Sequence, residues 1–321
     1  MRTLIILSFC LSLLSCEKKE LPVAKQDRGD IVTTQIEMKS DYRNQVWYSL
    51  HDDKVVSVNL KTDWDLAFEA SASGFHVMLN GAKSMKIYKT GFTALAQVTD
   101  TSGLGTGSKA DMPGGSLDST AIGNWQADNK VYVLNRGYNE AGLQLGFYKL
   151  KIKSVTATAF TFEYGDIYGS STSQGMVNKD EAYNFIMYSF TDNMQKYIEP
   201  KRTEYDLCFT QYTHIFLDPF QYYQVTGVLC NNYNTRVAKI MNKPFTDIAI
   251  ADTLNASFKT RKDIIGYDWK TFNLNTNIYT VDPAMCYIIE DNKGFYYKLH
   301  FIDFVNSSGI KGFPKFEFKK L

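Results

Sequence analysis

The sequence contains 321 residues and has a formal net charge of +1, because 35 Lys and Arg residues balance 34 Asp and Glu residues. A net charge this close to neutral gives no electrostatic case for nucleic acid or an anionic membrane surface as a partner. Aromatic residues make up 14% of the chain, with 21 Tyr and 21 Phe, and such side chains commonly fill the cores of β proteins.

The first 16 residues are typical of a bacterial lipoprotein signal peptide. Met1-Arg2 provides a basic start, and residues 4–14 form an uncharged, mostly apolar run of eleven residues. This run is shorter than the roughly 20 apolar residues that a membrane-spanning helix needs. Leu13-Leu14-Ser15-Cys16 resembles the lipoprotein cleavage box, so we predict Cys16 as the lipid attachment residue and the lipid as the membrane anchor. The alternative is an ordinary secretory signal with an incidental cysteine.

Residues 17–40 are polar without clear periodicity, which predicts a flexible tether. The charged residues 17–20, directly after Cys16, resemble the surface-export signal of lipoproteins in the Bacteroidetes. We therefore predict a lipid-anchored protein of the outer membrane and favour exposure at the cell surface. A solvated linker that specifies no leaflet is the alternative.

The remainder of the chain contains five internal matches in the same order, whose offset grows steadily from 140 to 154 residues. The matched segments are 47–53 with 187–193, 62–68 with 203–209, 122–123 with 265–266, 147–150 with 296–299, and 160–164 with 314–318. Ordered self-similarity of this kind indicates a tandem duplication. We predict one domain over 41–167, a linker rich in small residues over 168–181, and a second domain over 182–321.

Both predicted domains have the sequence pattern of β structure. Val46, Tyr48 and Leu50 alternate with polar neighbours, and Asp52-Asp53 predicts a turn into a second strand. Residues 286–304 predict a hairpin with its turn at 291–294, and 315–319 alternate cleanly. The sequence contains no amphipathic helix of more than a few turns, so the predicted fold class is all-β, with long loops such as 101–119.

Three cysteines follow the signal and anchor: Cys208, Cys230 and Cys286. An odd number without short spacing is not a disulfide framework. Buried thiols are the favoured interpretation, and a Cys208–Cys230 bridge is the alternative.

The paired motifs resemble the HmuY family of haem-binding lipoproteins of the Bacteroidetes, present here as a tandem duplication. The resemblance is carried by the Asp-Trp-Asp-Leu-Ala-Phe segment at 63–68 and by the closing segments 294–304 and 312–318. It implies an all-β haemophore that captures haem for iron acquisition and passes it to a TonB-dependent outer-membrane receptor. It also implies that two loop histidines or methionines hold the haem iron, and both are known haem ligands.

The expected second-ligand position after Trp125 or Trp269 holds neither His nor Met, which is a departure from the family pattern. The remaining candidate haem ligands are Met112, in a Gly-rich loop, Met241, its loose counterpart in the second unit, and His51 at a hairpin tip. For both methionines the alternative is ordinary packing, and for His51 it is solvation.

Motifs for catalysis or metal binding are not evident in the sequence. The four histidines lack zinc-site spacing, and neither a Gly-x-Ser-x-Gly elbow nor a Cys-x-x-Cys pair occurs. Asp63 and Asp65 share one strand face, but Glu204 and Asp206 repeat them, which favours a structural role. We therefore predict no enzyme. The leading function is haem binding, and the alternative is a non-catalytic interaction or assembly lipoprotein of the envelope that has lost haem binding.

Overall fold

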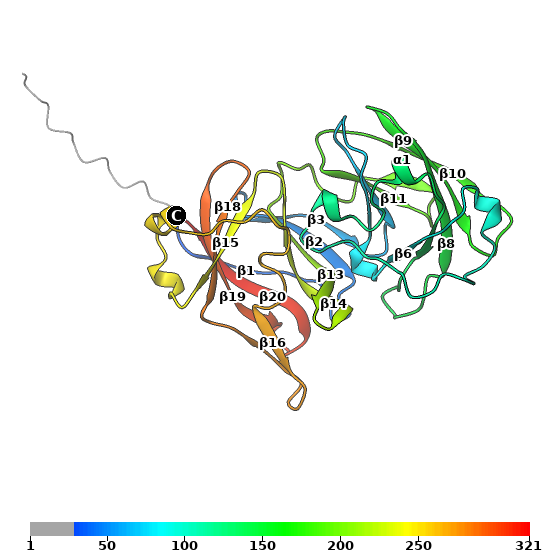
Figure 1. Ribbon diagram of the computed structural model, residues 1–321. Helices are drawn as coiled ribbons and strands as arrows, with labels where there is room; N and C mark the ends of the chain where they lie inside the picture. The colour runs from blue at the N-terminus through cyan, green and yellow to red at the C-terminus, as the bar shows by residue number, and fades with distance from the viewer. Residues whose placement is uncertain (1–28) are drawn as a thin grey trace, which may run out of the picture.

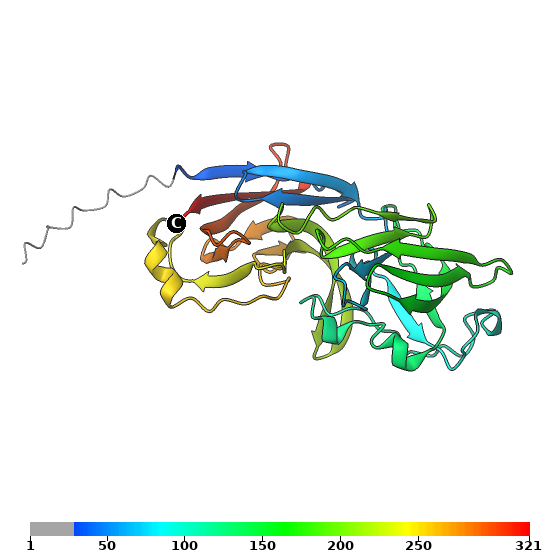
Figure 2. The same ribbon diagram turned by 90° about the horizontal axis from the view of Figure 1, so that it is seen from above.

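The computed structural model describes residues 29–321, so the predicted signal peptide, Cys16 and the first part of the predicted tether lie outside the described residues. The described chain forms two β lobes that lie side by side in both views (Figures 1 and 2). One lobe, which we call the inserted lobe, is contiguous from residue 61 to residue 199. The other, the outer lobe, combines residues 29–60 with residues 200–321.

The outer lobe contains two antiparallel sheets. Its outer sheet has the strand order β1 (Val32–Gln35), β20 (Lys311–Lys320), β19 (Tyr296–Val305), β18 (Met285–Glu290) and β15 (Arg236–Met241). Its inner sheet has the order β14 (Phe220–Cys230), β13 (Leu207–Leu217), β2 (Asn44–Ser49) and β3 (Lys54–Leu60). A separate hairpin is formed by β16 (Lys270–Asn273) and β17 (Ile278–Val281).

The inserted lobe repeats this plan with a five-stranded outer sheet and a four-stranded inner sheet. The outer sheet has the order β10 (Ser173–Asn178), β9 (Ala159–Asp166), β8 (Phe147–Val155), β7 (Tyr132–Asn135) and β6 (Lys86–Lys89). The inner sheet has the order β12 (Met194–Lys196), β11 (Phe185–Ser189), β4 (Leu66–Glu69) and β5 (Val77–Leu79).

Helical structure in the described chain is limited to single turns. The α-helix α1 (Trp125–Asp128) has four residues. The 3₁₀ turns are η1 (Gly81–Lys83), η2 (Leu95–Gln97), η3 (Leu117–Ser119), η4 (Phe245–Asp247) and η5 (Ile250–Leu254). Among residues 29–321, no helix has the length and apolar character needed to cross a membrane. The predicted all-β fold class is confirmed.

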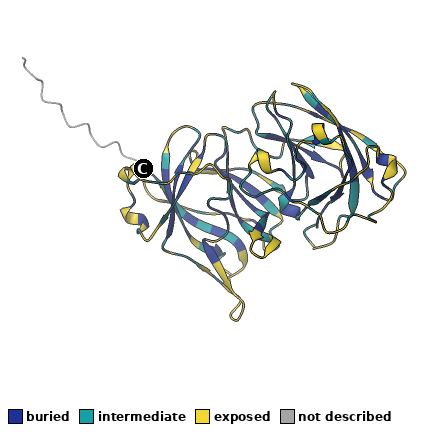
Figure 3. Ribbon diagram, in the orientation of Figure 1, coloured by how far each residue is buried: buried dark blue, intermediate teal, exposed yellow. Residues whose placement is uncertain are grey.

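Each lobe buries its own aromatic-rich core between its two sheets (Figure 3). Alternation along β20 shows the cause: Phe316 and Phe318 are buried while their neighbours remain partly exposed, because successive strand residues point to opposite faces. In the outer lobe Phe316 stacks on Phe209, with ring centroids 5.5 Å apart. In the inserted lobe Phe68 stacks on Phe162 at 5.0 Å. Such pairs add to the stabilisation from area burial.

The two main sheets of one lobe correspond strand by strand to those of the other. The pairing registers relate the same residues as the internal sequence matches: Leu150 is opposite Tyr164, and Leu299 is opposite Phe318. In the inner sheets Met187 is opposite Ala67, and Trp47 is opposite Cys208. The duplication itself is an inference about how the sequence arose and stays a prediction.

The sheets pair across the predicted domain boundaries. Strand β2 of the unit 41–167 pairs with β13 of the unit 182–321, and β4 pairs with β11 in the same crossed way. Neither predicted unit therefore forms a lobe by itself, because each lobe takes its first strands from one unit and its later strands from the other.

Two further segments differ from the prediction. Val32–Gln35, inside the predicted tether 17–40, form strand β1 and pair with β20. Ser173–Asn178, inside the predicted linker 168–181, form β10 and pair with β9. Both strands occupy the edge of an outer sheet, where a polar sequence is tolerated because only one side of the strand needs a partner.

The crossed pairing predicts how fragments behave. We expect the fragment 61–199 to fold on its own, because it contains every strand and the whole core of the inserted lobe. The fragment 41–167 lacks β11, the partner of β4, and should not fold. Circular dichroism with thermal melting distinguishes the two: a cooperative transition for 61–199 and none for 41–167. A cooperative transition of 41–167 would contradict the crossed arrangement.

Candidate functional site

A pocket lies where the inner sheets of the two lobes face each other. It has walls from both lobes: Trp64, Ala67 and Met187 in the inserted lobe, and Trp47 and Cys208 in the outer lobe. About 900 Å³ inside it is not filled by protein atoms, and part of that space is open to solvent. The two walls come from equivalent strands of the two lobes: Ala67 on β4 is the counterpart of Cys208 on β13. The pocket therefore forms only when both lobes are assembled.

Four methionine thioethers lie on the inserted-lobe side of the pocket: Met78, Met85, Met112 and Met187. Met85 and Met187 are buried, whereas Met78 and Met112 are half-buried. Thioethers are flexible, polarizable groups that adapt to varied apolar ligands and also bind soft or haem metals. This wall can therefore hold a large apolar molecule and offer sulfur ligands to an iron ion.

The loop that carries Met112 is held in place on both sides. Lys109 forms two backbone hydrogen bonds with Ile87, of 2.9 and 2.8 Å, which continue the edge of β6. The carboxylate of Asp111 accepts 2.6 Å hydrogen bonds from the backbone N–H groups of Leu79 and Ala121. Met112 is therefore presented from an anchored loop base, which limits the entropy lost when a ligand binds.

The structure separates the three candidate haem ligands. Met112 lines the pocket, whereas Met241 lies at the end of β15 in the outer lobe, opposite Met285, with 44% of its surface exposed. His51 follows β2 at a hairpin tip, where its ring stacks on Phe295 at 5.3 Å. Neither Met241 nor His51 lines the pocket. Lys262 of the outer lobe corresponds to Met112. The bridge between Val237 and Lys259 is the counterpart of the bridge between Ile87 and Lys109, and each residue lies three positions after the lysine of its bridge.

Sequence reasoning missed Met78, Met85, Met187 and Lys262. Met187 occurs in the internal match of 187–193 with 47–53, where it occupies the place of Trp47. An apolar residue at both matched positions, Trp47 and Met187, was a sequence signal that the two lobes contribute to one apolar wall. The other three give no sequence signal, because they meet only after the two inner sheets face each other.

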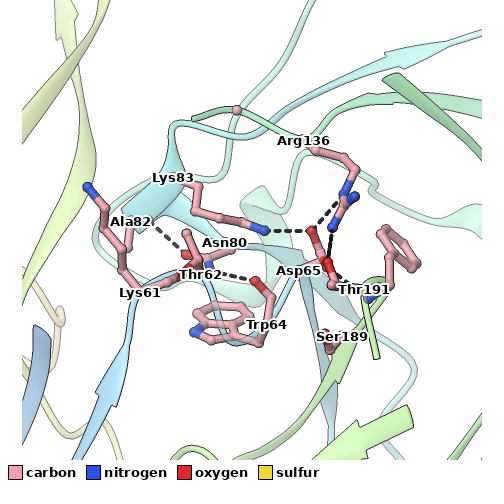
Figure 4. A network of polar contacts seen from close by, with 12 residues as sticks. Lys61, Thr62, Trp64, Asp65, Asn80, Ala82, Lys83, Arg136, Ser189 and Thr191 are labelled. Carbon is pink, nitrogen blue, oxygen red and sulfur yellow. Dashed lines mark hydrogen bonds and ion pairs between the residues drawn. The ribbon is translucent and has the colours of Figure 1, made fainter. Parts of the chain in front are cut away.

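A buried ionic network stabilises the inserted lobe next to the pocket (Figure 4). The carboxylate of Asp65 is fully buried and accepts hydrogen bonds from Lys83 Nζ at 2.5 Å and from the Arg136 guanidinium at 3.1 Å through two nitrogens. The backbone N–H of Phe190 adds a fourth donor at 2.8 Å. Burial alone would raise the pKa of Asp65, but Lys83 and Arg136 outweigh burial and the pKa is lowered.

The geometry of Asp63 and Asp65 supports the structural role that the sequence favours. Both oxygens of Asp65 are occupied, and the Oδ2 atom of Asp63 accepts a 2.8 Å hydrogen bond from the backbone N–H of Leu60. The two carboxylates therefore close a turn and neutralise two buried cations. They present no reactive face to the pocket.

The corresponding carboxylate of the outer lobe, Asp206, has no such cations. Its Oδ2 atom accepts a 2.7 Å hydrogen bond from the backbone N–H of Leu50, as Asp65 does from Phe190. The place of Arg136 is taken by Asp291, which is 1% exposed and whose Oδ2 atom lacks a hydrogen-bond partner among the described residues. Burial, with a contribution from the charge of Asp291, raises the pKa of Asp206 to about 7.

Cysteines and metal-binding groups add little to the described site. Cys208, Cys230 and Cys286 are buried free thiols, and the first two line the pocket. Burial raises the pKa of the Cys230 thiol to about 12, so it is a neutral apolar wall group. Within residues 29–321, no group of three or more His, Cys, Asp or Glu side chains is arranged to hold a metal ion.

The observations so far define a class: an all-β, two-lobed binding protein with an apolar, thioether-lined pocket between its lobes. Comparison with known proteins gives the family. The model of the HmuY protein family matches residues 41–318, and the chain belongs to that family. No curated protein matches the sequence.

The solved structures that are similar to this chain come from several bacterial species. Apo PinO from Porphyromonas gingivitis is 9% identical, with 91% of this chain and 98% of that chain covered and a TM-score of 0.32. The Tannerella forsythia apo HmuY analog is 10% identical, with 92% and 98% covered and a TM-score of 0.26. An HmuY-like protein from Bacteroides vulgatus is 12% identical, with 91% and 94% covered and a TM-score of 0.26.

The two buried carboxylates should respond oppositely to neutralisation. Asp65→Asn leaves Lys83 and Arg136 buried without their counter-charge, and should lower the free energy of unfolding by about 3 kcal/mol at pH 8. Asp206→Asn keeps an acceptor for Leu50 and removes a poorly stabilised charge, so stability at pH 8 should be unchanged or higher. Urea denaturation measures both. Equal losses in the two variants would contradict the assigned environments.

The raised pKa of Asp206 also predicts a pH dependence of stability. Between about pH 4 and pH 7 the folded protein holds a proton on Asp206 that the unfolded chain has released. The favourable effect of this protonated Asp206 on the free energy of unfolding is therefore fully present below pH 4 and is lost as the pH rises through 7. Comparing urea midpoints of the wild type and Asp206→Asn from pH 4 to 8 should show a difference that changes in this window, on the order of a few kcal/mol. A constant difference would contradict the prediction.

Proposed function

We propose that this protein is a lipid-anchored envelope protein that binds haem in the pocket between its lobes. The observation that carries the proposal is the clustering of Met78, Met112 and Met187 on one wall of that pocket in a member of the HmuY family. The resemblance to haem-binding lipoproteins suggests haem as the ligand, and the methionine sulfur atoms are groups that can bind haem iron.

The residues present fit a haem group. Its flat apolar ring requires apolar and aromatic surfaces, which Trp47, Trp64 and Phe185 provide. Its iron requires one or two axial ligands, and Met112 on its anchored loop can provide one sulfur. The cavity volume itself is about 120 Å³, below the roughly 300–1,000 Å³ that is usual for small-molecule sites, so the pocket must widen to hold haem.

The proposed location and partner follow from the anchor. A lipid on Cys16 would hold the two lobes at the outer membrane, with exposure at the cell surface as the favoured orientation. A TonB-dependent outer-membrane receptor is the proposed acceptor of the haem. The family relationship and the lipoprotein signal of residues 1–16 support this proposal.

A second candidate, an envelope interaction protein without haem, is favoured by one observation. The β13–β14 hairpin extends eleven residues on each strand and exposes Leu217 and Phe220 at its tip, with 73% and 63% of their surfaces accessible. Exposed apolar residues at a projecting tip are typical of contact sites for other proteins.

A haemin titration tests the proposal. The protein of residues 17–321, without Cys16, should give a saturable change of the Soret band at micromolar haemin. Met112→Ala should shift the Soret maximum and weaken binding at least about tenfold, because a missing axial sulfur changes the iron coordination. Met241→Ala is the matched control, since this methionine lies outside the pocket, and should behave as the wild type.

Two results would count against the proposal at different levels. A flat titration of the wild type would reject haem binding and favour the interaction protein. Saturable binding that is identical in the wild type and Met112→Ala would keep the function and reject Met112 as a ligand.

A further inference from the structure

Lys262 is the single basic side chain on the pocket wall within the described chain. It lies on the loop that precedes Ile265, and it occupies the outer-lobe position that corresponds to Met112. A lone cation beside an apolar cavity needs an explanation, because a charge next to low-dielectric walls is costly unless an anion meets it.

The backbone and stem of Lys262 are firmly placed. Its N–H donates to the carbonyl oxygen of Gly114 at 3.0 Å, and its carbonyl oxygen accepts from the N–H of Cys230 at 2.7 Å. Its methylene stem lies over Gly115, where any side chain would collide with it, so a glycine is needed there. Lys262 is thus clamped between β14 and the loop that carries Met112.

The ammonium group lies near one carboxylate, that of Glu199, without forming a contact ion pair with it. Lys262 forms no ion pair within residues 29–321, and its Nζ atom lies 5.9 Å from the centroid of the Phe185 ring. Its positive charge opposes the burial that raises the pKa of Glu199, Cys208 and Cys230, all of which line the pocket, so the ammonium group lies close to this part of the pocket wall.

The two acidic side chains of the pocket are occupied elsewhere. Both oxygens of Asp111 accept backbone hydrogen bonds. The Oε1 atom of the buried Glu199 accepts from Asn184 at 2.5 Å and from the Tyr205 hydroxyl at 2.7 Å. The cation at Lys262 therefore remains available to a ligand.

We propose that the pocket selects an amphiphile with an apolar body and one acidic group, and that Lys262 binds the acidic group. The inference rests on the proposed function and deepens it: for haem, the acidic group is a propionate. Met112 and Lys262 then act from matched positions of the two lobes, one toward the centre of the ligand and one toward its edge. Such a pair would set the orientation of the ligand as well as its affinity.

The first arm of the test uses haemin and its dimethyl ester, in which both propionates are blocked. The wild type should bind haemin about tenfold more tightly than the ester, the usual scale for a hydrogen bond to a charged group. Lys262→Met should bind haemin and its ester equally, and Lys262→Arg should retain the preference for haemin. Lys259→Met, an exposed lysine outside the pocket, is the matched control.

The second arm does not depend on haem. The probes are 8-anilinonaphthalene-1-sulfonate and N-phenyl-1-naphthylamine, which share an apolar body and differ in the sulfonate. The wild type should prefer the sulfonate, and Lys262→Met should lose that preference. Circular dichroism confirms that the variants are folded.

The two proposals fail in distinguishable ways. If the wild type binds haemin and its ester equally, or if Lys262→Met keeps the preference for the acid, the role of Lys262 is overturned and haem binding stands. If the wild type gives no haemin signal, haem binding is rejected and the second arm decides the role of Lys262. Equal binding of the two probes, or binding of neither, then overturns it.

Discussion

The crossed strand pairing is the constraint on which the rest of the structure depends. The chain leaves the outer lobe after β3, builds the whole inserted lobe from 61 to 199, and returns to pair β13 with β2. Antiparallel backbone hydrogen bonds close this path, so the inner sheet of the outer lobe joins strands that lie before and after the inserted lobe in the sequence. The pocket exists because the same crossing brings the two inner sheets face to face.

The two lobes have different charged side chains at equivalent buried positions. The carboxylate after Trp64 is matched with two cations, and the corresponding carboxylate after Tyr205 faces Asp291 instead. The first arrangement stabilises the inserted lobe through a satisfied ionic network. The second leaves a buried carboxylate with a raised pKa, so the stability of the outer lobe depends on pH near neutrality.

The pocket shows the same divergence. Met112 and Lys262 sit at corresponding positions on loops that contact each other, and one offers a sulfur whereas the other offers a positive charge. A pocket with two identical walls would accept a symmetric apolar ligand in either orientation. Different chemistry on the two walls provides the basis for a directed binding mode, and this asymmetry links the proposed haem site to the proposed acidic group.

The sequence by itself determined the all-β class, the family and the position of the internal matches, because alternation and turn residues are local properties of the chain. It also placed Met112 in a loop worth testing, but it kept Met241 and His51 as further candidates. The tertiary structure was needed to show that β2 pairs with β13, that segments 32–35 and 173–178 are strands, and that Met112 and Lys262 line the same pocket. The periodicity of a strand shows which of its faces is buried, but it does not show which distant strand lies beside it. The strand pairs between the two matched units could therefore not be predicted from the sequence.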